Sequence, residues 1–131
     1  MSFVRLTLAQ VEALADGLPV HAAPREVLEV ANALAAYDAL PELDPLRVDD
    51  LLRAHGLLTA GLQPEAGEFR TVEVEIVGVD GTVLHTGSRV EKVPRLVGEL
   101  LEWAAGSSDH PVVVSSAVHF LIEHIHPFRD G

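Results

Sequence analysis

The sequence contains no cysteine, few aromatic residues and far fewer basic than acidic side chains. Without thiols, the chain can form neither a disulfide framework nor a thiolate-ligated zinc site. Lys and Arg number 9 against 20 Asp and Glu, which gives a formal net charge of −11. Such a surface repels the phosphates of nucleic acid, so we exclude nucleic acid as a direct partner. A small nucleotide is not excluded, because one local anion site can outweigh the global charge.

Long apolar runs are also missing. None approaches the roughly 18 residues that a membrane span requires, and the first five residues do not look like a signal peptide. Together with the absence of cysteine, this favours a cytoplasmic protein that binds no membrane. The 131 residues suffice for one domain with a real core. We expect an N-terminal segment with a short helix over residues 1–20 and the main domain over residues 21–131.

Apolar residues recur at helical spacing in five places. The last of these segments is apolar on nearly all sides, which is typical of a central helix surrounded by others. For the helix after Pro45, the expected core positions are Leu46, Leu51, Leu52 and Leu58. The five predicted helices are Leu6–Ala15 with Thr7 as N-cap, a helix from Pro24 to Leu40, the helix after Pro45, Val90–Trp103, and Pro111–Ile125.

Residues 71–84 change to a period of two, with Val72, Val74 and Ile76 separated by glutamates. This pattern predicts a half-buried strand, a turn at residues 79–82 and a returning strand at residues 83–85. An isolated hairpin is only marginally stable, so it must pack on helices or on a partner. The expected fold class is therefore mostly α, a helical bundle with one β-hairpin.

The last six residues, His126-Pro-Phe-Arg-Asp-Gly131, follow the final helix and combine groups suited to phosphate chemistry. A histidine with an ordinary pKa of about 6.5 can accept a proton from a hydroxyl near neutral pH. Asp130 can bind magnesium, and Gly131 can begin a turn whose N–H groups face an anion. From the residues alone, a structural histidine, a helix-capping aspartate and an ordinary turn glycine remain open.

These residues resemble the first part of the Fic family signature, His-x-Phe-x-Asp/Glu-Gly-Asn-x-x-Arg. Upstream, residues 25–32 and 51–58 resemble family helices, and Gly67-Glu-Phe-Arg70 resembles the Gly-x-aromatic-Arg that precedes the family hairpin. The resemblance covers roughly residues 24–131. The Asn and Arg of the signature would lie beyond Gly131, so we expect this 131-residue chain to be inactive by itself.

The resemblance implies a Fic-like bundle whose hairpin is a flap that clamps a target protein by strand addition. It implies a protein adenylyltransferase that moves AMP from Mg-ATP to a Ser, Thr or Tyr hydroxyl. Family flaps often carry prolines after the second strand, whereas this chain has Thr86-Gly-Ser88. The implied roles are general base for His126, magnesium ligand for Asp130, nucleotide binding for Gly131, and target docking for Leu84, His85 and Thr86.

Two alternatives remain open: transfer of another nucleotide or of phosphate on the same scaffold, and a non-catalytic protein-interaction module. A zinc site at His119, Glu123, His124 and His126 is disfavoured, because the helix is apolar and His-Glu-x-x-His is absent. We further expect Phe128 to anchor the core, Arg129 to face solvent, and His55 and His110 to lie in loops or at helix ends.

Self-inhibition in the family commonly uses a glutamate in a Ser/Thr-x-x-x-Glu-Gly/Asn helix. Neither Ser2 nor Thr7 has a glutamate at that spacing, and Glu12 is one residue late. One residue rotates a helical side chain by about 100°. We therefore expect inhibition to come from a separate antitoxin-like chain or from a C-terminal helix that is missing here.

Overall fold

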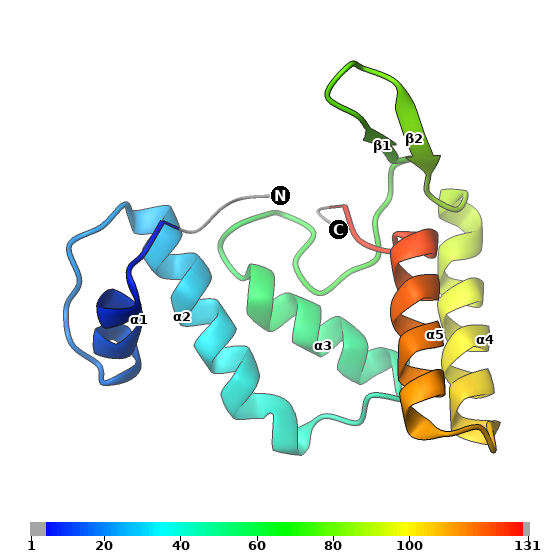
Figure 1. Ribbon diagram of the computed structural model, residues 1–131, viewed down its shortest axis with the longest axis horizontal. Helices are drawn as coiled ribbons and strands as arrows, with labels where there is room; N and C mark the ends of the chain where they lie inside the picture. Colours follow the sequence, from blue (N-terminus) through cyan, green and yellow to red (C-terminus); the bar gives the residue numbers. More distant parts are fainter. Residues whose placement is uncertain (1–4, 130–131) are drawn as a thin grey trace. The chain divides into compact units, whose positions relative to one another are not determined.

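The structure is a computed structural model that describes residues 5–129, and Figure 1 shows its elements. The chain divides into two compact units: residues 1–44 with 49–68, and residues 45–48 with 69–131. We describe each unit by itself. Among the described residues, no helix has both the length and the hydropathy to cross a bilayer.

The first unit holds three helices at the positions that the sequence predicts. Helix α1 spans Leu8–Ala15, α2 spans Pro24–Ala39 with a 3-10 turn over Leu40–Glu42, and α3 spans Val48–Thr59. Thr7 is the N-cap of α1, as predicted, because its side chain accepts the N–H of Gln10 while the Gln10 side chain accepts the N–H of Thr7.

Two polar residues of α3, and not its leucines, form the buried face of that helix. His55 and Thr59 are buried, one turn apart, whereas Leu58 is 46% exposed and Leu46, before the helix, is 44% exposed. The expectation that Leu46 and Leu58 are core positions is therefore wrong. The prediction that His55 lies in a loop or at a helix end is also wrong, since it is buried inside α3.

The His55 ring is buried because it has a fixed partner in the following loop. Its Nδ1 accepts the N–H of Gly67 at 3.0 Å. Gly67 has a φ of +79°, and a Cβ there would lie 3.4 Å from the Cα of Gly56 on α3. The loop can therefore approach the helix only through two glycines, and the histidine fixes it there.

The hairpin consists of β1, Glu75–Val77, paired antiparallel with β2, Val83–Thr86. The prediction of a half-buried strand starting at Val72 is wrong. Strand β1 is three residues long and exposed at each of them. The pairing is irregular between Ile76 and Val77, and Val72 is still 39% exposed. The alternation of the sequence thus produces a hairpin that projects beyond the two helices of its own unit (Figure 1).

The second unit is built on α4, Val93–Gly106, and α5, Pro111–Ile125, which lie side by side (Figure 1). A 3-10 turn, Val90–Lys92, precedes α4. Five residues of α4 are buried on one stripe, as its spacing predicts. They are Val93, Val97, Leu100, Leu101 and Ala104.

Helix α5 has the predicted bounds, but among the described residues it is not surrounded by others. Ile125 is its one buried residue, while Val112 and Phe120 are 64% and 66% exposed. The prediction of burial on all sides is wrong for this part of the chain, because α4 covers a single stripe of α5.

Candidate functional site

His126 is the residue at which α5 stops. It is the C-cap, with φ 54° and ψ 64°, and its N–H donates to the Ile122 carbonyl at 2.9 Å. Among residues 5–129 it is the one residue other than glycine with a positive φ. A non-glycine residue in the left-handed region costs on the order of 1 kcal/mol, and such strain often marks a functional site. The backbone here is therefore held by its surroundings.

The His126 side chain is half-buried, and its two ring nitrogens are not equivalent. Nδ1 is inaccessible to solvent. A proton from a bound hydroxyl could therefore reach this ring only through Nε2, the nitrogen that remains for chemistry.

Phe128 anchors the loop after His126, as predicted. It is 5% exposed, and its ring stacks on Phe69 with centroids 5.8 Å apart. Pro127, between the two loop residues, is completely buried. Arg129 is exposed, also as predicted. Asp130 and Gly131, the expected metal and nucleotide residues, lie outside the described residues.

The flap residues have different environments. Leu84 is 68% exposed, and Thr86 is exposed and pairs with Glu75 of β1. His85 points toward α5: its Nε2 donates to the His124 carbonyl at 2.7 Å, and the two imidazole centroids lie 4.6 Å apart. Leu84 and Thr86 are thus exposed, whereas the His85 ring bonds the hairpin to the end of α5.

Among residues 5–129, no group of three possible ligands is close enough to hold a metal ion. His110 is the N-cap of α5, as predicted, and its Nδ1 accepts the N–H of Val112 at 3.1 Å.

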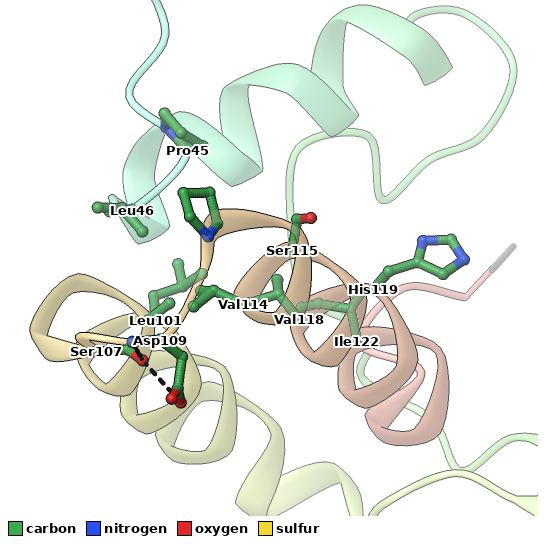
Figure 2. A pocket seen from close by; sticks show the side chains of 12 residues that line it. Pro45, Leu46, Leu101, Ser107, Asp109, Val114, Ser115, Val118, His119 and Ile122 are labelled. Atoms are coloured by element: carbon green, nitrogen blue, oxygen red, sulfur yellow. Dashed lines mark hydrogen bonds between the residues drawn. The ribbon is translucent and has the colours of Figure 1, made fainter.

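A groove lies along α5 toward its Pro111 end, whereas His126 caps the opposite end of the helix. This apolar groove has a volume of about 600 Å³. Figure 2 shows Val114, Val118 and Ile122 of α5 along it. The described residues that line it include no lysine or arginine, and its carboxylate, Asp109, already accepts the Ser107 hydroxyl at 3.3 Å. The groove therefore has no side chain with a permanent positive charge among the described residues, and we place the candidate site at His126.

Arg70, for which the sequence predicted no role, connects the hairpin to the loop that contains His126. This arginine is 2% exposed, and its own N–H donates to the Pro127 carbonyl at 3.0 Å. Its guanidinium donates to the carbonyl of His126 at 2.6 Å. The sequence signal was the arginine of Gly67-Glu-Phe-Arg70, directly before the hairpin. The resemblance to the family motif accounted for this residue but assigned it no function.

Fold and site together define a helical domain in which a short hairpin is rooted beside a histidine loop at the end of an apolar helix. The sequence model of the Fic/DOC family matches residues 45–131. The chain belongs to the Fic/DOC family. No curated protein matches it.

Solved structures agree with this assignment. A Fic family protein from Desulfovibrio desulfuricans G20 has a TM-score of 0.88 and 42% identity over 97% of this chain and 39% of its own. Fic-1 from C. elegans has a TM-score of 0.79 and 26% identity over 98% and 39%. A Fic domain-containing signaling protein from Bacteroides thetaiotaomicron VPI-5482, at 19% identity and a TM-score of 0.84 over 97% and 52%, shares the fold. The chain thus spans about half or less of these proteins.

Proposed function

We propose that the full-length protein transfers AMP from Mg-ATP to a Ser, Thr or Tyr hydroxyl of a target protein. The observation that carries the proposal is His126, held in a left-handed loop beside the root of the flap, in a chain of the Fic/DOC family. In this proposal, His126 would be the proton acceptor next to the hairpin that would present the target.

In the proposed reaction, Nε2 of His126 takes the proton of the target hydroxyl. The freed oxygen forms a bond to the α-phosphorus of ATP, the bond from that phosphorus to the bridging oxygen breaks, and pyrophosphate leaves with the electron pair. A general base of this kind contributes about 10²–10⁴ in rate.

Asp130 and Gly131 have roles that rest on the sequence. A carboxylate beside nucleotide phosphates is the oxygen donor set that magnesium prefers, and one carboxylate suffices because magnesium keeps several waters. When bound, the ion would offset the negative charge of the phosphates. The Gly131 backbone N–H would belong to the turn that faces the phosphates.

The target would add a strand to the hairpin. A two-stranded sheet offers unpaired N–H and C=O groups on its outer edges, and strand addition uses such groups for affinity. Leu84, on β2, offers a large exposed apolar side chain for specificity. Control by a separate antitoxin-like chain stays a prediction.

Mass spectrometry of the full-length protein incubated with Mg-ATP and a cell extract tests the proposal. We expect a mass gain of one AMP on a hydroxyl residue of the enzyme or a target, and its loss in His126→Ala. His119→Ala, which removes an exposed histidine from the same helix, is the matched control and should retain activity. A mass gain of phosphate or of another nucleotide would replace AMP transfer by that reaction. No transfer and no Mg-ATP binding in calorimetry would favour a non-catalytic interaction module.

A further inference from the structure

The guanidinium of Arg70 lies at the junction of the flap and the histidine loop. Its side chain is completely buried. It donates to the carbonyls of Val72, which precedes β1, and Ser88, which follows β2. It also donates to the carbonyls of Ile125, at 3.3 Å, and His126, at 2.6 Å. One side chain therefore holds both roots of the hairpin and the end of α5.

The charge of this guanidinium is compensated mainly by backbone dipoles. Within residues 5–129, its nearest carboxylate oxygen is Glu73 Oε2, 3.8 Å from Nη1, on a side chain that is 55% exposed. A buried cation is costly unless it is fully hydrogen-bonded. Arg70 makes these bonds from three nitrogen atoms of a rigid fork, whereas the three donors of a lysine radiate from one nitrogen and would not span the same carbonyls. The position therefore requires arginine for its geometry and not only for its charge.

The hydrogen bonds of Arg70 also satisfy backbone carbonyls at the end of α5. The last carbonyls of a helix have no partner within the helix. Here, four successive carbonyls accept hydrogen bonds from the residues that flank or form the hairpin, so the flap region caps the helix. The bonds join His124 O to His85 Nε2 at 2.7 Å, Ile125 O to the Ser88 N–H at 3.1 Å, His126 O to Arg70 Nε at 2.6 Å, and Pro127 O to the Arg70 N–H at 3.0 Å.

We propose that Arg70 is the positioning residue for His126: its bonds to the His126 and Ile125 carbonyls hold the left-handed backbone that directs the imidazole. This inference rests on the proposed function for its kinetic consequences. Because the same guanidinium holds Ser88 and Val72, a target strand that orders the flap would stabilise the arrangement of the base. Arg70 itself would touch neither nucleotide nor target.

Gly87 gives an independent way to perturb the same junction. A Cβ at this position would lie 2.9 Å from Val74 Cγ2, 3.0 Å from Arg70 Nη2 and 3.3 Å from His126 Cβ. Gly87→Ala would therefore press on the guanidinium and on the base together, while both side chains remain present.

The test compares Arg70→Lys with Arg89→Lys, both in the full-length protein. Arg89 is an exposed arginine next to Ser88, and its guanidinium pairs with Glu91 at 2.9 Å. We expect kcat of Arg70→Lys to fall about 10–100-fold, the effect of misplacing a catalytic group by about 1 Å, with the KM for ATP changed less than about twofold. Arg89→Lys should keep the wild-type kcat. Wild-type kcat in a folded Arg70→Lys protein would overturn the proposal. A loss of kcat/KM that came entirely from a higher KM for ATP would also overturn it.

Two measurements do not depend on activity. In Arg70→Lys, the NMR signals of the isotope-labelled His126 imidazole should shift, and the Ser88 amide hydrogen should exchange faster with solvent. If both the signals and the exchange rate stayed unchanged, the positioning role would be overturned, even if the wild-type protein transfers no AMP. If Arg70→Lys does not fold, Gly87→Ala should reproduce the kcat loss and the His126 shift, and wild-type behaviour there would overturn the proposal. A wild-type protein without AMP transfer but with these shifts would refute the proposed function and leave the positioning role standing.

Discussion

Removal of the Phe128 ring is the perturbation whose cost can be worked out most directly from the structure. Phe128 is 5% exposed and stacks on Phe69 at a centroid distance of 5.8 Å. Truncation of a buried phenylalanine to alanine costs about 3–5 kcal/mol, of which an aromatic pair of this geometry supplies about 0.5–1.5 kcal/mol. We therefore expect Phe128→Ala to lower the free energy of unfolding by about 3–5 kcal/mol.

Urea unfolding of the full-length protein, followed by near-ultraviolet circular dichroism, measures this cost. Phe128→Leu is the conservative variant and should lose less, about 1–2 kcal/mol, since it keeps most of the apolar volume. A double-mutant cycle with Phe69→Leu should show a coupling energy of about 0.5–1.5 kcal/mol. A cost below 1 kcal/mol for Phe128→Ala, or a coupling near zero, would refute the idea that the stacked pair anchors the histidine loop.

Three further predictions concern stability. Asn32→Ala should cost about 1–3 kcal/mol in urea unfolding, because its buried amide donates to the carbonyl of Leu58, at the end of α3, at 3.2 Å and to that of Ala60, just after α3, at 2.8 Å. Gly67→Ala should lower the melting temperature, because its φ of +79° is strained for any residue with a Cβ; an unchanged melting temperature would contradict this left-handed backbone. The backbone N–H and the hydroxyl of Thr82 lower the pKa of Asp80, so the turn is stabilised above the ordinary value of 3.8, and hairpin amide protection should fall as the pH drops below it; Asp80→Asn should abolish that pH dependence.

The parts of the fold that local patterns determine were predictable. Pro111 and Ile125 are the true ends of α5, and Thr7 caps α1, because a proline, a capping side chain and a regular apolar stripe are each visible in a few adjacent residues. The family signature likewise located His126 at the end of its helix. These features depend on neighbours in the sequence.

What could not be predicted depends on distant partners. The burial of His55 requires Gly67, twelve residues later, and the role of Arg70 requires the carbonyl of His126, 56 residues later. The alternation at Val72 and Ile76 suggested a covered strand, but periodicity reports which side chains share a face and not whether any layer covers that face. For the same reason, the composition of α5 could not reveal how much of the helix the rest of this chain covers.

The capping of α5 by residues of the hairpin region has a consequence for folding. A helix end that is capped by the residues directly after it can form together with the helix. The end of α5 instead needs hydrogen-bond donors from residues 70, 85 and 88. The contact between Arg70 and His126 closes a loop of 56 residues, so it carries a chain-closure cost that nearby contacts do not. An isolated peptide of α5 should therefore be frayed at the histidine, and the left-handed backbone of His126 should appear only when the ends of the hairpin are in place. A partly folded chain would then carry the histidine without the fixed orientation that the folded protein gives it.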